Sequence, residues 1–489
     1  MDDHTSVGRQ FQRRAAAVPR LGLGLSVDVY SPDLFDLMTR FEGRPSTPSF
    51  LEIFRATPTA LQAVRERLTA MPLAYHGEGL WITQPGFSTG PLFDEELNEV
   101  ASQLNMLASP WLNHECATKQ MGGYSFGTYL PPLYTPESAR LVAANIAVVQ
   151  ERLDRSRRPG EAFGPLFLLE MAPLTYFMAG TIGVAQYFRL IADRTPCGLV
   201  LDIGHLWTVF HYSADRKRSS LKEFLEQFLD EFPMERVIEI HIAGLAPHEA
   251  AVSLEDSDSE WIDAHSAPIP AVSWAVLRRV LDHPRLQNLR GVALEVDTKS
   301  AEVIVDEFGE AAALIGRTVD RLLGRTRSCE SVVEPPEVGS PVRAGDLDEC
   351  DLESEYVRYA LVASGQAPPA GPAWKAVAEH PSGLERYIRV YLPYEILHWG
   401  GDLRDMFPNT CRRLSERGVS LDEFVPWWFR KPRHADGPYD FFLTKIDRLV
   451  EFVAEREPGL LAQARCEAQQ LRLAYEEASA GRQPLEPSR

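Results

Sequence analysis

Several features that mark other classes of protein are missing from this sequence. None of its apolar runs reaches the roughly 18 residues that a bilayer-spanning helix needs, and its N-terminal stretch has basic residues without the apolar segment of a secretory signal. Basic residues are also few, since 50 Lys and Arg against 69 Asp and Glu give 489 residues a formal net charge of −19. Such a charge argues against a protein whose main task is to bind nucleic acid or an anionic membrane. We therefore expect a cytoplasmic protein that contacts neither.

Cysteine is scarce, and its spacing matches no metal-binding or redox motif. The chain has six cysteines and no CxxC pair, which excludes a zinc ribbon and a thioredoxin-type motif. A disulfide framework is not expected in so long a chain without an export signal. The thiols are therefore predicted to be reduced, and the twelve histidines become the more informative residues.

Short apolar runs alternate with amphipathic segments of helical length from about residue 20 to residue 325. Two of these segments begin with Thr57-Pro58 and Thr135-Pro136, which predicts a threonine N-cap with proline at the first helical position. Eight strands, each followed by a helix, make up a (β/α)8 TIM barrel of the α/β class. An open doubly wound sheet is the alternative, but the first run, LGLGLS, lacks the GxGxxG phosphate-binding turn. The predicted strands are 21–26, 49–54, 72–76, 111–116, 166–171, 197–203, 236–243 and 291–297.

The composition changes after the predicted barrel. Residues 326–347 contain three prolines and no helical periodicity, which predicts a linker between a barrel domain, 1–325, and a smaller all-α domain, 348–489. The second domain is dense in aromatic residues, including the sequence PWWF at 426–429. Adjacent residues of a helix face different directions, so at least one of Trp427 and Trp428 is predicted to lie at a surface or interface. An aromatic anchor of this kind suits recognition of an amphipathic peptide.

Ionisable residues are concentrated where the predicted strands end. The carboxyl ends of the strands of a TIM barrel converge on one face, where the active sites of this fold lie. A single histidine or carboxylate there is more often structural, but burying many of them together is costly without compensating charge. The candidates come from strands three to eight and from the loop WIDAHSAP: His76, His114, Glu170, Asp202, His205, His241, Asp263, His265 and Glu295.

Metal ions would supply the compensating charge. The candidates combine imidazoles with carboxylates and include no thiolate, a ligand set that suits Zn, Fe or Mn. One metal needs about four to six ligands, so the surplus favours two or three metals with a bridging carboxylate from Glu170, Asp202 or Glu295. Some candidates would instead orient the ligands. We expect Glu170, Asp202 and His205 to act most directly in catalysis.

A series of motifs in register connects these residues to a known family. In chain order they are HGEGLW, LPPLYT, VVQERL, LLEMAP, CGLVLDIGH, IEIHIAG, WIDAHSAPI and ALEVD, spread over residues 20–320. The sequence thereby resembles the multinuclear non-haem iron-dependent oxidases, a family of the xylose-isomerase-like TIM barrels.

The resemblance implies a TIM barrel that holds two or three iron ions in mixed Fe(II)/Fe(III) states. It also implies an enzyme that uses O2 to modify a ribosomally made precursor peptide, most often at cysteine. Members commonly act with a small partner protein that recognises the peptide, a task that the C-terminal domain could take over in cis. Carried over position by position, the metal site falls on His76, His114, Glu170, Asp202, His241, Asp263, His265 and Glu295.

The sequence departs from the family pattern at two places. Asp202-Ile203-Gly204-His205 stands where many members have Asp-x-Asn-Asn, so that His205 would replace an asparagine ligand, and Asn113 stands where many members have Glu. The DIGH sequence is also similar to sugar-isomerase-like barrels. A metal-dependent sugar isomerase or epimerase is therefore a second hypothesis, although a helical appendage is unusual for it. A metal-dependent nuclease is a third, which the acidic charge disfavours, and a non-catalytic binding barrel is a fourth, which the large ligand set disfavours.

Overall fold

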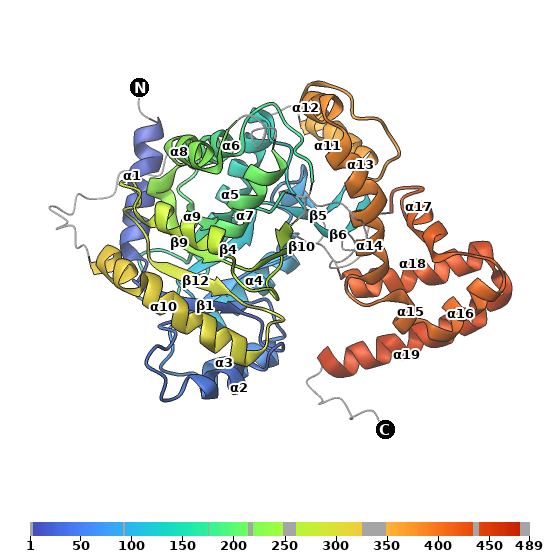
Figure 1. The fold of residues 1–489 in the computed structure, drawn as a ribbon, viewed down its shortest axis with the longest axis horizontal. Helices are drawn as coiled ribbons and strands as arrows, with labels where there is room; N and C mark the ends of the chain where they lie inside the picture. Colours follow the sequence, from blue (N-terminus) through green and yellow to red (C-terminus); the bar gives the residue numbers. More distant parts are fainter. Residues whose placement is uncertain are drawn as a thin grey trace.

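The structure is a computed structural model that describes residues 3–90, 93–174, 176–213, 219–247, 261–324, 349–433 and 440–479. Eight parallel strands form a closed barrel in the order β1-β12-β9-β8-β7-β4-β3-β2, which confirms the predicted TIM barrel (Figure 1). All eight predicted strands are present. They are β1 (Gly22–Val27), β2 (Leu51–Phe54), β3 (Leu73–His76), β4 (Trp111–Glu115), β7 (Leu166–Glu170), β8 (Gly198–Asp202), β9 (Val237–Ile242) and β12 (Gly291–Glu295).

Helices between the strands form the outer layer of the barrel. The Thr57 side chain accepts a hydrogen bond from the Ala60 N–H at the start of α3 (Pro58–Arg67), and Thr135 caps α5 (Pro136–Arg155) in the same way. Both predicted helix starts are thus confirmed. The other helices of this layer are α2 (Leu34–Phe41), α4 (Phe93–Leu107), α6 (Val184–Ala192), α7 (Ile203–Tyr212), α8 (Leu221–Glu231), α9 (Ala271–Leu281) and α10 (Ala301–Gly324), with short 3-10 turns η1 (Phe87–Thr89) and η3 (Met234–Arg236).

An N-terminal helix, α1 (Asp3–Ala17), packs at the amino end of the barrel, and the sequence pattern did not predict it. Its residues Phe11 and Ala15 are fully buried in one apolar core with Phe50 and other barrel residues. Arg290 donates from Nε and Nη2 to the Ala15 carbonyl, at 3.1 and 2.7 Å. It thereby provides hydrogen bonds to a carbonyl in the last turn of the helix, which has no partner within the helix. A Cβ on Gly24 would lie 2.4 Å from the Phe50 ring, so this glycine of LGLGLS serves close packing. The amino end of the barrel is therefore filled by apolar side chains, and the polar side chains gather towards the carboxyl end.

Two antiparallel hairpins extend the loops at the carboxyl end of the barrel. The first, β5 (Thr118–Met121) with β6 (Tyr124–Leu130), follows strand β4. The second, β10 (Leu245–Pro247) with β11 (Trp261–Asp263), follows strand β9 and carries two of the predicted site residues at and after its end. No helix in the described part of the chain is both long and apolar enough to cross a bilayer.

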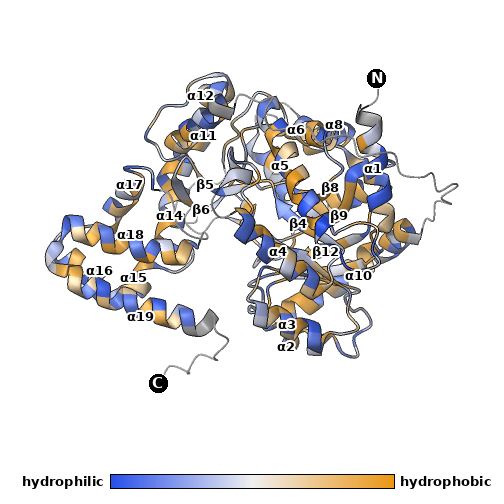
Figure 2. Ribbon diagram, turned by 180° about the vertical axis from the view of Figure 1, so that it is seen from behind, coloured by the Kyte–Doolittle hydropathy of each residue, from blue (hydrophilic) through white to orange (hydrophobic). Residues whose placement is uncertain are grey.

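The C-terminal region is helical, as predicted, and lies to one side of the barrel, with the β5–β6 hairpin between them (Figure 1). The predicted linker, 326–347, lies outside the described residues. Hydrophilic and hydrophobic residues alternate along α16, α18 and α19 (Figure 2), the pattern of helices that bury one side. The elements are α11 (Glu349–Ala363), η6 (Pro372–Trp374), α12 (Lys375–Glu379), α13 (Ser382–Arg386), the π-helical turn η7 (Tyr387–Tyr391), α14 (Leu392–His398), α15 (Leu403–Met406), α16 (Pro408–Glu416), η8 (Leu421–Glu423), α17 (Phe424–Trp428), α18 (Phe441–Arg456), η9 (Pro458–Leu460) and α19 (Leu461–Ser479).

The C-terminal helices share one apolar core with the β5–β6 hairpin. Phe429, directly after α17, packs against Tyr124 and Phe126 of the hairpin, with ring centroids 6.3 and 5.2 Å away. The Trp428 indole N–H donates to the Ser125 carbonyl at 2.8 Å. The helical region is thus joined to the barrel loops by both apolar packing and hydrogen bonding.

Neither Trp427 nor Trp428 lies at the solvent surface, but Trp428 lies at the interface between the helical region and the β5–β6 hairpin, the second of the two predicted locations. Their exposed fractions are 2% and 3%. Trp428 faces the hairpin, whereas Trp427 packs against Phe452 of α18, 5.5 Å between ring centroids, and donates to Glu455 at 2.8 Å. Both are buried because the short helix α17 lies between two different surfaces.

Candidate metal centre

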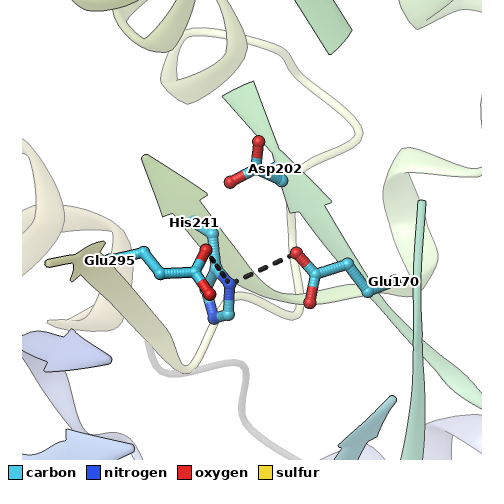
Figure 3. A group of neighbouring side chains, drawn as sticks. All are labelled: Glu170, Asp202, His241 and Glu295. Atoms are coloured by element: carbon cyan, nitrogen blue, oxygen red, sulfur yellow. Dashed lines mark ion pairs between the residues drawn. The ribbon is translucent and has the colours of Figure 1, made fainter. Parts of the chain in front are cut away.

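Four side chains from four different barrel strands converge at the carboxyl end of the barrel (Figure 3). Glu170, Asp202 and Glu295 end their strands, and His241 lies near the end of β9. All four are buried, and one potential ligand atom of each lies within 4.8 Å of those of the others. His241 Nδ1 is 3.3 Å from Glu170 Oε1 and 3.5 Å from Glu295 Oε2. This group is termed the central cluster below.

A second group shares Asp202 with the central cluster. His205 Nε2 lies 3.3 Å from Asp263 Oδ2 and 3.9 Å from Asp202 Oδ1. Asp263 Oδ2 is also 2.8 Å from His265 Nε2, which in turn lies 3.6 Å from Glu295 Oε2. The β10–β11 hairpin thus brings Asp263 and His265 to the strand ends, and the two groups are continuous through Asp202 and Glu295.

His76, at the end of β3, contacts Glu170 of the central cluster. Its Nε2 is 3.3 Å from Glu170 Oε2, and the same oxygen accepts a hydrogen bond from Asn113 Nδ2 at 2.6 Å. The two oxygens of Glu170 therefore face different histidines, His76 and His241. A carboxylate placed in this way can bridge two cations.

In three of the histidines, one ring nitrogen faces the carboxylates of the site and the other ring nitrogen contacts an oxygen of another residue. The second contacts are His205 Nδ1 with the Met171 carbonyl, His265 Nδ1 with Asp297 Oδ1, and His241 Nε2 with Glu52 Oε2. A partner on the far nitrogen fixes the ring and directs the other nitrogen at a metal, as in carboxylate–histidine–metal arrangements. The rings are therefore held in an orientation suited to metal binding.

Two buried glutamates beside His241 were not among the predicted site residues. Glu52 and Glu239 are both 0% exposed, and their oxygens lie 3.0 and 3.6 Å from His241 Nε2. Glu52 also accepts hydrogen bonds from Ser26 Oγ at 3.1 Å and from Trp111 Nε1 at 3.0 Å. The sequence contained a signal for both, because each interrupts an apolar strand, and a charge inside a buried strand needs a partner.

His114 does not join the cluster, which departs from the predicted ligand set. Its Nε2 accepts a hydrogen bond from the Leu80 N–H at 3.0 Å, and its Nδ1 faces the Glu115 carbonyl at 2.9 Å. The preceding residue, Asn113, points at Glu170, and successive side chains of a strand point to opposite faces. Burial lowers the pKa of His114 to about 4, so this imidazole is neutral.

Burial and unlike charges shift the pKa values of the cluster in different directions. Burial raises the pKa of Asp202 to about 7. Burial also acts to raise the pKa of Glu170, but the adjacent His241 and His76 outweigh it and hold that pKa well below its usual value. The pKa of His241 is raised well above its usual value, because the surrounding carboxylates outweigh its burial. The carboxylates thus require positive charge, which protonated histidines or bound cations can provide.

The donor atoms of the cluster fit metal ions. Among the described residues, three buried carboxylate oxygens of the cluster have no hydrogen-bond partner: Glu170 Oε1, Asp202 Oδ2 and Asp263 Oδ1. Leaving such atoms unsatisfied is costly in a protein interior. Carboxylate and imidazole donors of this kind suit Zn, Fe and Mn.

The part of the chain that contains the cluster also matches a protein family. Residues 37–315, more than half of the chain, match the model of the RiPP precursor modification enzymes MbnB/TglH/ChrH. The chain belongs to this family. The match confirms the family resemblance drawn from the eight motifs, and it identifies the chain as an enzyme whose substrate is a ribosomally synthesised precursor peptide. It ends at residue 315, so the C-terminal helices lie outside the MbnB/TglH/ChrH match.

Relatives of this MbnB/TglH/ChrH family member include UPF0276 proteins from several bacteria. One from Vibrio vulnificus (strain YJ016) is 23% identical over 304 residues, which are 61% of this chain and 92% of the relative. One from Caulobacter vibrioides (strain NA1000 / CB15N) is 28% identical over 218 residues, or 44% of this chain and 65% of the relative. Similar solved structures include endonuclease IV from Thermus thermophilus, with 19% identity over 61% of this chain and 100% of that chain, at a TM-score of 0.36. A D-tagatose 3-epimerase-like protein is 14% identical over 59% of this chain and 98% of that chain, also at a TM-score of 0.36.

Proposed function

We propose that this chain is an iron- and O2-dependent oxidase that modifies a precursor peptide at cysteine or another residue of its C-terminal core. The observation that carries the proposal is the position of Glu170 between His76 and His241, in a cluster that continues through Asp202 to His205. Family membership supplies the peptide substrate, and this geometry supports more than one metal ion.

The ligand set that we propose is the predicted one without His114. Its members are His76, Glu170, Asp202, His205, His241, Asp263, His265 and Glu295. Two or three iron ions in mixed Fe(II)/Fe(III) states would supply electrons for the reduction of O2 and positive charge that keeps a substrate thiolate deprotonated.

Three residues are proposed to lie closest to the reacting atoms. Glu170 would hold metal together with His76 and His241, which face its two oxygens. Asp202 Oδ1 accepts the His205 backbone N–H at 2.6 Å and so caps α7, while its Oδ2 stays available to the cluster. The His205 ring is held at Nδ1 by the Met171 carbonyl, which leaves Nε2 on the side of Asp263. These contacts set the direction of each donor before a metal binds.

Metal analysis of the protein purified without oxygen tests the proposal. We expect about two or three equivalents of iron with the spectroscopic signature of coupled ions. Added precursor peptide should change mass only when O2 is admitted, and the Glu170→Ala variant should leave the peptide unchanged. A protein that holds only zinc or a single divalent ion would contradict an oxidase. Sugar isomerisation or epimerisation without O2 would support the alternative activity instead.

We also propose that the C-terminal helical region contributes to recognition of the peptide, in place of a small partner protein. The three aromatic residues of the PWWF sequence are buried and are not available as an anchor, whereas Trp399, directly after α14, is 53% exposed. A Trp399→Ala variant should bind the precursor peptide more weakly and keep its metal content. Unchanged peptide affinity would place recognition elsewhere.

A further inference from the structure

We infer that the C-terminal helical region positions the metal centre by holding the chain segment that follows Glu170. This segment (171–174 and 176–183) connects β7 to α6, and it is termed the post-β7 segment below. Gly383 and Tyr391 of the helical region are the positioning residues. The inference rests on the metal centre proposed above.

The post-β7 segment contains a residue with an unfavourable backbone conformation. Tyr176 has a φ of 63°, in the left-handed region that bulky residues rarely adopt. Such a conformation is strained and persists only where the surroundings hold it. Tyr176 is 4% exposed, and its surroundings therefore decide whether the segment keeps this shape.

The helical region provides those surroundings. A Cβ on Gly383, in α13, would lie 1.9 Å from the Tyr176 carbonyl oxygen, so the backbone of this helix lies directly against the segment. The Tyr391 ring packs edge-on against the Tyr176 ring at 5.4 Å between centroids. Further along, the Gly180 N–H donates to the Ala373 carbonyl at 2.7 Å. Packing and a backbone hydrogen bond thus fix the segment at two places.

The same segment also contacts residues of the metal centre. It begins at Met171, whose carbonyl holds Nδ1 of His205. On its other side, the Tyr176 ring packs against Tyr212 at 5.1 Å between centroids, and the Tyr212 hydroxyl donates to the Trp261 carbonyl at 2.8 Å.

Trp261 begins the short strand β11, which ends at Asp263. A shift of Tyr176 would therefore reach Asp263 through Tyr212 and β11, and Asp263 in turn contacts His205. Because metal ligands must be held within about half an ångström, such a shift would weaken metal binding.

Hydrogen exchange of the full-length protein without added metal tests the inference, using Gly383→Ala and the control Gly316→Ala. Gly316 lies in α10, and a Cβ there meets nothing within 4 Å. We expect amides 176–183 to exchange about tenfold faster or more in Gly383→Ala, the scale of an overpacked contact. Exchange in α18 should stay unchanged, and Gly316→Ala should behave as the wild type. Tyr391→Leu, which removes a ring without adding a clash, is the second variant and should show the same faster exchange. It replaces Gly383→Ala in the test if that variant does not fold.

Titration with Fe(II) and, separately, Zn(II) links the segment to the metal centre. We expect the affinity of Gly383→Ala or Tyr391→Leu to fall by about tenfold or more, as for loss of other contacts that orient ligands. Unchanged exchange at 176–183 in the variants would overturn the inference, and so would faster exchange with unchanged metal affinity. Failure of the wild type to bind iron while binding zinc would contradict the proposed oxidase alone.

Discussion

His241 Nε2 and Glu52 Oε2 lie 3.0 Å apart, on the side of the imidazole that faces away from Glu170 and Glu295. This contact assigns Nδ1 as the nitrogen that faces the central cluster. Both residues come from barrel strands and are 0% exposed, so the barrel itself sets the orientation of the ring. Glu52 thereby contributes to the metal centre by orienting His241 and not by facing the central cluster.

Replacing Glu52 by glutamine should weaken metal binding without unfolding the protein. Glutamine can accept the Trp111 N–H through its one carbonyl oxygen and can donate its amide N–H to Ser26 Oγ, but it loses the charge opposite His241. We expect metal affinity to fall by about 10- to 100-fold, measured by competition with a chelator. Trp111→Phe, which keeps the Glu52 carboxylate, is the matched control and should have a smaller effect. Equal affinities of wild type and Glu52→Gln would show that the contact does not orient the ring.

Replacing Glu170 by alanine should abolish metal loading. Glu170 contacts His76 and His241 through different oxygens, so its loss affects both sides of the cluster. We expect elemental analysis to find less than about one metal equivalent, with an unchanged helical circular dichroism spectrum. Glu302→Ala, at a side chain that is 81% exposed in α10, serves as the control. Full metal loading of Glu170→Ala would place the metal centre elsewhere.

The structure predicts that His114→Asn keeps its metal. Both ring nitrogens of His114 have partners outside the cluster, at Leu80 and Glu115. Loss of these buried hydrogen bonds should cost about 1–3 kcal/mol of unfolding free energy, measured with urea, while the metal stoichiometry stays the same. Loss of one metal equivalent would instead show that His114 turns into the cluster when metal binds.

Glu395 should make the stability of the helical region depend on pH. Its side chain is 3% exposed, and burial raises its pKa from 4.5 to about 8, against the smaller effects of Tyr391, Lys119 and Lys445. Between pH 4.5 and about 8, this carboxyl group is therefore protonated in the folded state and ionised in the unfolded state. Stability contributed by this group is present below pH 4.5 and is lost as the pH rises to about 8, at no more than about 1.4 kcal/mol per pH unit.

A Glu395→Gln variant should lack this loss, because glutamine does not titrate. Urea unfolding at several pH values between 5 and 8 measures the difference between the two proteins. Parallel pH profiles would show that Glu395 is ionised in the folded protein. Burial lowers the pKa of Lys445 to about 7 against the opposing charge of Glu395, so the comparison measures Glu395 together with its effect on Lys445.

The barrel could be predicted from the sequence because parallel strands buried on both sides are continuous apolar runs. The grouping of Glu170, Asp202, His241 and Glu295 followed from the same pattern, since the carboxyl ends of parallel strands meet at one face. Glu52 and Glu239 were not predicted as site residues because they lie inside apolar runs. Their role becomes visible only from their contacts with His241. The role of His114 depended on which face of β4 it occupies, and the neighbouring Asn113 takes the inward position.

The burial of Trp427 and Trp428 could not be predicted for a different reason. The rule that adjacent helical residues face different directions holds in α17, but both directions lead into protein. The second surface comes from the β5–β6 hairpin, about 300 residues earlier in the chain. Local periodicity carries no information about such a contact.

The apolar core that joins the helical region to the β5–β6 hairpin makes the hairpin depend on a protein surface that covers it. The hairpin lies within the family match, residues 37–315, whereas the helices that cover it begin at Glu349. The Vibrio vulnificus relative has little chain left for such a region, because its 304 aligned residues are 92% of its length. Removal of the helical region would therefore expose apolar side chains of the hairpin, including Phe126 and Leu130, to solvent.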